Sequence, residues 1–533
     1  MGTRVHARSL RALLALLVLA TLSLAAAGDA ERWWAHIKFL ADDSMQGRET
    51  GSEGHRKAAV YIASHFEKVG LSPAGTRGFM QPVSFRSQQI IEGQSSLALV
   101  RDGKVERLVL GDDAYFNVRV RGATKVNAPL VFAGYALTVP EAEQDDLAGL
   151  DLKGKVVVHF GGGPANVPGP LLAHYQNAAV RWEFLKRAGA IGTIAVRSPI
   201  GQDVPWDRAK LGRLRPALAL ADAEFDDTPG QQLSVTFNTD SFAKLLAGTG
   251  RNAAEIIALA AARKPLPTFA LPSSVQASWA VEAKTLEADN VVGVLPGSDP
   301  TLKNEIVVAT AHLDHLGIGE PINGDRIYNG AMDDASGIAT LIETAAAIKN
   351  EGKPLRRTVA FVAVTAEEHG LLGSRYFAVR PSLPKGSRIV ADLNVDMFLP
   401  LFPLKSIIAQ GLEESDLAAD LRRLGGAAGL RILSDPEPER NAFVRSDQYS
   451  FIRQGVPALS LKVGFDKGSP EHEIVIRWRK ERYHAPSDDL NQPVDMQSAV
   501  DFNRVFGQLI QAVANRDSVP RWNNDSFFRR FAR

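Results

Sequence analysis

Residues 304–317, NEIVVATAHLDHLG, begin the part of the chain that decides the fold. They contain a continuous apolar run bounded by polar residues, which is typical of a strand buried on both faces of a sheet. The same pattern returns in RRTVAFVAVTA (356–366), SRIVADLNVDM (387–397) and VPALSLKV (456–463), and helical patterns lie between the runs. Strands that alternate with helices predict an α/β fold, in which a mixed, largely parallel sheet has helices on both faces.

The residue pattern of the sequence changes between about Pro82 and Phe269. Short β-branched runs such as GKVVVHF and IGTIAV are separated there by Gly and Pro, with one helical stretch around VRWEFLKRAGA. Short strands with frequent turn residues are typical of a β-rich module. We therefore expect such a module over residues 120–275, inserted into a main domain formed by residues 28–119 and 276–518. Residues 519–533 form a C-terminal tail whose role the sequence does not indicate.

The N-terminus has the pattern of an export signal. Arg4, Arg8 and Arg11 precede the apolar run of residues 12–27, which ends in three alanines. This arrangement predicts a signal peptide over residues 1–27 that is cleaved on export. The run is shorter than the roughly 20 apolar residues that span a membrane, so we expect a periplasmic or secreted protein with no membrane anchor after cleavage.

Composition excludes several kinds of partner and site. Lys and Arg number 61 and Asp and Glu number 60, which gives a formal net charge of +1. No broad positive field is therefore expected to attract nucleic acid or an anionic membrane. The chain has no cysteine, so it forms no disulfide and any metal must be bound by His, Asp or Glu. The oligomeric state is not predicted.

Metal-competent side chains follow the predicted strands at their carboxyl ends, the edge where open parallel sheets bind ligands. A lone His there is usually a structural residue, and an Asp pair before a helix is usually a cap. Two His and three carboxylates together have the composition of a zinc site, and without a cation the carboxylates would repel one another. The residues concerned are His312, Asp333, Glu368, Asp396 and His484, and Glu367 adjoins Glu368 as a fourth carboxylate.

Five segments around these residues resemble a known family. TAHLDHLG (310–317), GAMDDASG (330–337), TAEEHGLLGS (365–374), NVDM (394–397) and RYHAPSDD (482–489) occur in the order found in the zinc peptidases that include secreted bacterial aminopeptidases and glutamate carboxypeptidases. The likeness extends to the opening segment HIKFLADDSMQGRETGSEG. The middle module is similar to the protease-associated domain that is often inserted in this family.

The resemblance implies a zinc peptidase fold with two zinc ions per chain. His312 and Asp396 would bind one ion, Glu368 and His484 would bind the other, and Asp333 would bridge them. These five residues are called the metal cluster below.

The resemblance also implies three roles around the metals. Glu367 would be the general base, and Asp314 would orient His312 as a supporting carboxylate. Tyr483 would help to stabilise the tetrahedral intermediate.

Other polar residues near the motifs have ordinary explanations. His315 and His369 are interpreted as structural residues or as supports of a ligand, and His472 is not expected to bind metal. Arg445, Ser446 and Asp447 are candidates either for pocket walls or for local hydrogen bonds in a loop.

The leading functional hypothesis is an aminopeptidase that removes N-terminal amino acids from peptides. The alternatives are a carboxypeptidase or dipeptidase of the same family, a one-zinc enzyme resembling glutaminyl cyclases, and a non-catalytic binding protein. The last should lack ligands or the base, whereas every motif position is filled here. The inserted module is either a lid that restricts substrate size or a tethered domain that serves stability or partner binding.

Overall fold

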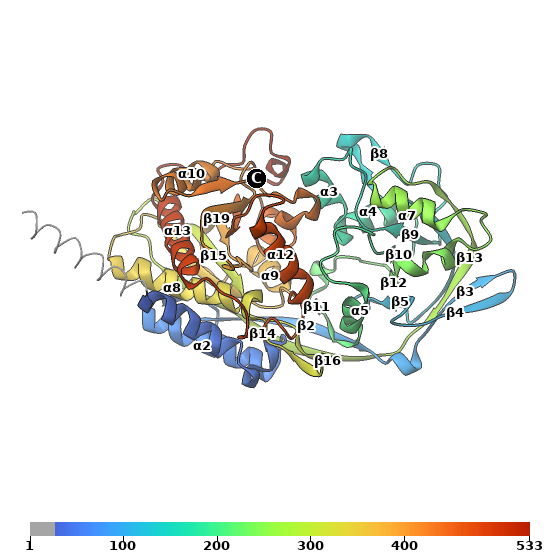
Figure 1. Ribbon diagram of the computed structural model, residues 1–533, viewed down its shortest axis with the longest axis horizontal. Coiled ribbons are helices and arrows are strands. Elements are labelled where there is room, and N and C mark those ends of the chain that lie inside the picture. The colour runs from blue at the N-terminus through green and yellow to red at the C-terminus, as the bar shows by residue number, and fades with distance from the viewer. Residues whose placement is uncertain (1–26, 533) are drawn as a thin grey trace, which may run out of the picture.

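The computed structural model describes residues 27–532. The predicted signal peptide lies outside the described residues apart from Ala27. Figure 1 shows two units side by side, each built around its own sheet. Within residues 27–532, no helix has both the length and the apolar character needed to cross a membrane.

The first unit is built on a ten-stranded sheet with the order β11-β2-β14-β18-β15-β19-β22-β20-β21, to which β1 (Ser72–Pro73) is added beside β14. Its four central strands are parallel, and the strands next to them on each side, β14 and β20, run antiparallel to them. The predicted mixed, largely parallel sheet is therefore confirmed. The central strands are β18 (Thr358–Val364), β15 (Glu305–His312), β19 (Arg388–Asn394) and β22 (Ala458–Val463), flanked by β14 (Val281–Leu295), β20 (Ser406–Gln410) and β21 (Arg431–Leu433).

Helices cover both faces of this sheet, which explains the uninterrupted apolar runs. Val307 of β15 lies in the core below one set of helices, whereas its neighbour Val308 packs with Phe377 and Phe451 of the other set. Successive side chains of a strand point to opposite faces, so both faces need apolar residues. The first set comprises helical residues 27–40, α2 (Glu53–Val69), α8 (Ser336–Glu351), α10 (Leu417–Ala427) and α13 (Met496–Asn515); the second comprises α9 (Leu372–Val379) and α11 (Gln448–Ile452).

The second unit is an eight-stranded sheet with the order β4-β3-β13-β6-β9-β10-β12-β5. It spans residues 96–278 and is called the inserted unit below. Its strands are β3 (Ser96–Arg101), β4 (Lys104–Leu108), β5 (Ala114–Phe116), β6 (Lys125–Ala133), β9 (Val156–Phe160), β10 (Gly192–Val196), β12 (Leu233–Phe237) and β13 (Thr268–Ser278). Its longer helices are α3 (Gly169–Tyr175), α4 (Ala178–Arg187) and α7 (Ala253–Ala261).

The inserted unit begins earlier than the module that the sequence predicts. Strands β3, β4 and β5 precede Val120, yet β3 pairs with β13 and β5 pairs with β12 in the same sheet. The residue pattern that predicts a strand is local, whereas the sheet that the strand joins depends on a partner strand distant in sequence. The predicted start at Val120 reflects that limit.

Two features bind the units together. The first is β11 (Ala217–Leu220), which belongs to the chain of the inserted unit but pairs with β2 (Met80–Ile90) at the edge of the main sheet. Strand β2 in turn pairs with β14 along its whole length. The C-terminal tail also touches both units, since Phe528 packs with Ala173 of α3 and with Val444. Figure 1 shows the C-terminus above the junction, between α10 and α3.

Candidate active site

The structure brings the predicted site residues to one edge of the main sheet. His312 ends β15, Glu367 and Glu368 follow β18, and Asp396 follows β19. Asp333 lies in the π-helical turn η7 (Ala331–Ala335) just before α8. His484 lies in the loop after α12 (Pro470–Glu481). The parallel strands deliver these side chains because their carboxyl ends share that edge.

Asp333 lies between the two histidines of the metal cluster. Its Oδ1 is 3.1 Å from His312 Nε2, and its Oδ2 is 3.3 Å from His484 Nε2. His312 Nε2 also lies 3.7 Å from Asp396 Oδ1, and His484 Nε2 lies 3.1 Å from Glu368 Oε2. The cluster therefore forms two His–carboxylate pairs that share one aspartate.

These residues fit a metal ion by their chemistry and by the partners that they lack. His312 Nε2, Asp333 Oδ2, Glu368 Oε1 and Asp396 Oδ1 are buried and make no hydrogen bond within the described residues. The ligand atoms of His312, Asp334 and Asp396 lie within 4.8 Å of one another, and so do those of His315, Asp333 and Glu368. A buried polar atom without a partner is costly, and cations bound among these side chains would satisfy such atoms. Imidazole nitrogens with carboxylate oxygens are a donor set typical of zinc.

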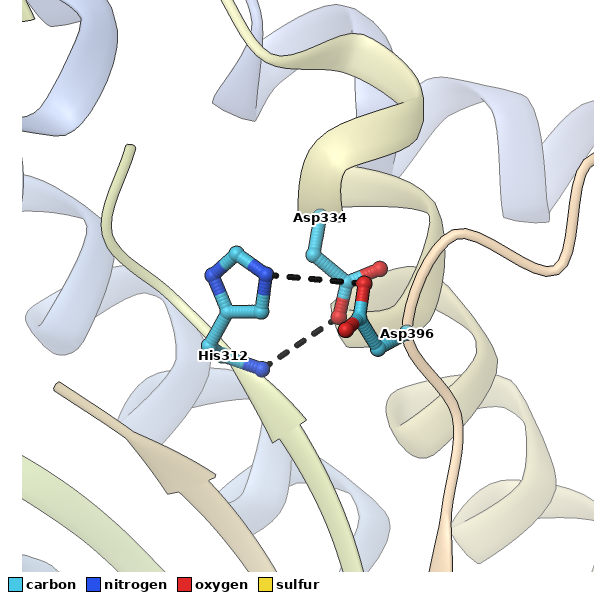
Figure 2. Close-up of side chains that lie close together, drawn as sticks. All are labelled: His312, Asp334 and Asp396. Atoms are coloured by element: carbon cyan, nitrogen blue, oxygen red, sulfur yellow. Dashed lines mark hydrogen bonds and ion pairs between the residues drawn. The ribbon is translucent and has the colours of Figure 1, made fainter. Parts of the chain in front are cut away.

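The neighbouring Asp334 has a different task. Figure 2 shows the His312 ring directed at Asp396, while Asp334 contacts the His312 backbone. The Asp334 carboxylate accepts hydrogen bonds from the N–H groups of His312 (3.3 Å), Gly337 (3.0 Å) and Met397 (3.2 Å). Because its oxygens already have these partners, Asp334 holds the backbone around the cluster, and Asp333 is the aspartate that faces both imidazoles.

Asp314 acts in a way that differs from the sequence interpretation. The His312 ring contacts the Asp314 carbonyl oxygen through Nδ1 at 3.1 Å, whereas the nearest Asp314 carboxylate oxygen is 3.9 Å away. A hydrogen bond from Nδ1 to the carbonyl leaves Nε2 free to bind metal. The Asp314 carboxylate instead accepts from the backbone N–H groups of Glu367 (3.1 Å) and Glu368 (3.3 Å). It therefore fixes the turn that presents both glutamates.

Glu367 has the features of a free acid–base group. Its carboxylate makes no hydrogen bond or ion pair with any described residue and lines the cavity at the site. Burial raises the pKa of Glu367 well above its ordinary value, and the carboxylate of Asp447 adds to this rise against the lowering effect of His312. A carboxylate that binds protons more readily than usual suits proton transfer.

Tyr483 lies beside the cluster. Its ring centroid is 3.9 Å from that of His484, and its side chain lines the same cavity. Its hydroxyl has no hydrogen-bond partner among the described residues. Burial raises the pKa of Tyr483 well above its ordinary value, so the hydroxyl keeps its proton and can donate a hydrogen bond.

His315 lies closer to the cluster than the sequence suggests. The side chain is fully buried, and its Nδ1 is 2.7 Å from Glu368 Oε1 and 3.8 Å from Asp333 Oδ2. It therefore contacts two members of the cluster. Its position three residues after His312 is a weak signal, because spacing alone does not show where a side chain points.

Two further residues, to which the sequence patterns assign no role, hold the turn that carries Asp333. Buried Arg48 donates hydrogen bonds to the carbonyl oxygens of Leu313, Leu40, Asn329 and Gly330. Asp488 accepts from the backbone N–H groups of Met332 and Asp333. Both residues lie in motif segments, so their place in the sequence was the available signal.

A cavity of about 110 Å³ opens from the cluster. Arg445 and Ser446 line it. Asp447 is not part of the lining; its carboxylate is fully buried without a hydrogen bond, and burial raises the pKa of Asp447 to about 7. The remaining histidines of the motifs point elsewhere. His369 contacts Glu49 at 2.8 Å, and His472 lies 3.4 Å from Glu437.

Comparisons with known proteins agree with a metallopeptidase. Residues 290–510 match the profile of Peptidase family M28, which confirms the family resemblance for that part of the chain. The chain is 28% identical over 262 residues to a probable leucine aminopeptidase 2 of Aspergillus oryzae, covering 46% of this chain and 48% of that protein. It is 26% identical over 285 residues to a probable glutamate carboxypeptidase of Arabidopsis thaliana, covering 47% of this chain and 35% of that protein.

A solved structure matches over nearly the whole length. The aminopeptidase from Aneurinibacillus sp. strain AM-1 superposes with a TM-score of 0.54 at 20% identity, over 93% of this chain and 94% of that one. This likeness shows a shared fold. The chain spans about half or less of the length of the two curated relatives, so their activities carry over only as proposals.

Proposed function

We propose that this chain, whose residues 290–510 belong to peptidase family M28, is a zinc-dependent exopeptidase that removes amino acids from the N-terminus of peptides. The observation that carries the proposal is Asp333 between two His–carboxylate pairs, 3.1 Å from His312 and 3.3 Å from His484. Two zinc ions suit this arrangement. His312 and Asp396 would hold one, Glu368 and His484 the other, and Asp333 both.

The residues around the cluster would share the work of hydrolysis. Zinc bound here would supply positive charge that polarises the scissile carbonyl and lowers the pKa of the attacking water. Glu367 would accept a proton from that water as its oxygen bonds to the carbonyl carbon, and would then pass the proton to the leaving nitrogen as the C–N bond breaks. The Tyr483 hydroxyl would donate a hydrogen bond to the negative oxygen.

Cleavage at the N-terminus needs an acidic group for the free α-amine of the substrate. Asp435 lines the cavity, is neither a proposed metal ligand nor the proposed base, and can meet that need. One observation favours the second candidate, a carboxypeptidase or dipeptidase. Arg445 is an exposed side chain at the cavity without an ion pair to any described residue, and a guanidinium is suited to a terminal carboxylate.

Blocked substrates separate the two candidates. The zinc-loaded protein is offered leucine p-nitroanilide, its N-acetyl form, and a dipeptide with either a free or an amidated C-terminus. An aminopeptidase needs the free amine and cleaves the amidated dipeptide. Hydrolysis of the N-acetylated substrate alone would reject the aminopeptidase, and a strict need for the free carboxylate would favour the carboxypeptidase.

We also propose that the inserted unit narrows access to the site. A space of about 720 Å³ lies between them, lined by residues 161–163 of the inserted unit on one side and by Tyr483 and His484 on the other. Asp203 of the inserted unit crosses this space to pair with Arg440 at 2.6 Å. An insert in this position is expected to favour short peptides.

Export remains a proposal that rests on the predicted signal peptide. A fusion of residues 1–27 to a reporter enzyme that is active only outside the cytoplasm tests it. Retention of the reporter inside the cell would remove the support for a periplasmic or secreted protein.

A further inference from the structure

A cavity of about 250 Å³ lies between the inserted unit and the main sheet. Residues of β9, β10, β12 and α4 form one side, and β11 with Leu372 of α9 forms the other. Figure 1 shows α4, β9, β10 and β12 in the inserted unit and β11 where the two units meet. No member of the metal cluster lines the cavity. It is called the arginine cavity below.

Arg181 of α4 lies in this cavity without a partner. The residue is only 9% exposed, and its Nε and Nη2 make no hydrogen bond in the part of the chain that the structure describes. No carboxylate of that part lies within ion-pair distance. The nearest acidic influence is Asp146, and its carboxylate already accepts from the N–H groups of Tyr135 (3.2 Å) and Leu137 (3.1 Å) and from Gln144.

Arg119 adds a second unpaired guanidinium to the lining. Its side chain makes no hydrogen bond or ion pair with any described residue. The two acidic residues of the cavity are already paired, Asp226 with Arg121 at 3.8 Å and Asp227 with Arg375 at 2.6 Å. Arg181 and Arg119 are thus left without an ion pair among the described residues, and their nearest acidic influences are Asp146 and Asp227.

A buried charge is costly unless it is paired and hydrogen-bonded. A guanidinium meets both needs best with a carboxylate or phosphate group, which it can bind through two parallel N–H···O bonds. Side chains that complete such a shell also line the cavity. They are Asn117, Thr193, Gln231, Ser234 and Thr236. His159, in the same lining, adds no charge, because burial lowers its pKa to about 3.

We propose that the arginine cavity binds a small molecule that carries an oxyanion, either a carboxylate or a phosphate group, on Arg181 and Arg119. The cavity is large enough for more than a bare ion. Arg119 would also place the ligand near the loop that carries Glu367 and Glu368. A Cβ placed on Gly370, two residues after Glu368, would lie 2.9 Å from Arg119 Nη1, so Arg119 lies close to that loop.

Thermal unfolding of the full mature protein tests the proposal. Potassium phosphate and potassium succinate are titrated to about 10 mM, with potassium chloride at equal ionic strength as the reference. We expect the better ligand to raise the Tm by about 3 °C, because it binds only the folded state. The larger of the two shifts identifies the group as phosphate or carboxylate.

Two variants on one helix make the test specific. R181Q removes the buried guanidinium, whereas R187Q removes an exposed one from the same helix. The shift should vanish in R181Q and persist in R187Q. An anion that binds instead at the metal cluster would stabilise R181Q as well, so this outcome separates the two sites and does not depend on peptidase activity.

Without added anions, R181Q should unfold at or above the Tm of the wild type, because the variant no longer buries an unpaired charge. If R181Q does not fold, R119Q replaces it and should lose at least half of the shift. The proposal is overturned if neither anion stabilises the wild type, or if the folded variant keeps the full shift.

Discussion

The metal cluster and the arginine cavity have opposite charges, and each lacks the counter-charge that would balance it. In the metal cluster, three carboxylates surround two imidazoles, and four buried atoms have no hydrogen bond. In the arginine cavity, two guanidiniums lack carboxylate partners, while both acidic residues of the lining are paired elsewhere. A buried imbalance of charge indicates what is to be bound: cations at the edge of the main sheet, and an oxyanion beside the inserted unit.

The difference also shows which sites a sequence reveals. The cluster residues lie at strand ends within five short motifs, so their positions follow from the strand pattern. Arg119 and Arg181 belong to no motif, and each is an ordinary arginine until the pairing of its neighbours is known. A sequence pattern therefore reveals a site at the ends of parallel strands more readily than it reveals a site whose side chains merely lack partners.

The largest expected effect follows from replacing Glu367, and it tests whether the cluster is a catalytic centre. E367Q should lower kcat by about 10²–10⁴-fold, because the amide is unable to accept the proton of the attacking water. The zinc content should stay at the wild-type level, since Glu367 is not a proposed ligand. E255Q, at an exposed position of α7 in the inserted unit, is the matched control. Wild-type turnover in E367Q would assign the base to another residue.

The next effect concerns Tyr483. Y483F keeps the ring against His484 and removes only the hydroxyl, which has no other hydrogen-bond partner among the described residues. We expect kcat to fall on the order of 10²-fold with KM little changed, because the lost hydrogen bond forms mainly in the transition state. A rise in KM at constant kcat would instead indicate that Tyr483 binds the substrate without stabilising the reaction.

A smaller effect concerns His315, which contacts Glu368 at 2.7 Å. H315Q should weaken zinc binding by about 10–100-fold, the usual result of losing a group that supports a ligand. Competition with a chromogenic chelator measures this affinity. H369Q is the control, because His369 contacts Glu49 and lies outside the cluster. Equal affinities in both variants would make His315 a purely structural residue.

The smallest effect concerns Glu437, which shows how this chain pairs other buried arginines. Burial alone would raise the pKa of Glu437, but Arg479 and Arg440 outweigh it and hold the pKa at about 2, below the ordinary 4.5. The ionised form therefore stabilises the fold above about pH 4.5, and this contribution is lost as the pH falls through 2. We expect a free energy of about 1 kcal/mol after screening by solvent.

The difference in Tm between the wild type and E437Q measures this contribution. It should be full at pH 6 and shrink steadily as the pH falls from about 4.5 to about 2. A difference that is independent of pH would mean that shape complementarity, and not charge, makes Glu437 stabilising. R181Q should show the opposite behaviour, with no loss of stability, because Arg181 has no carboxylate partner to lose.

Much of the main unit follows from the sequence, for reasons visible in particular residues. The apolar runs before His312 and Glu367 are buried on both faces, which their composition requires, and the carboxyl ends of parallel strands necessarily meet. The direction of His315 and the use of the Asp314 carbonyl in place of its carboxylate depend on backbone geometry that spacing does not encode. The start of the inserted unit at Ser96 depends on the pairing of β3 with β13, a contact between segments far apart in sequence.

The central claim is that Asp333 lies between two zinc ions. Crystals of the purified protein, measured on both sides of the zinc absorption edge, test it directly. We predict two anomalous peaks, one contacting His312 and Asp396 and the other contacting Glu368 and His484, with Asp333 touching both. A single peak, or peaks away from these side chains, would contradict it.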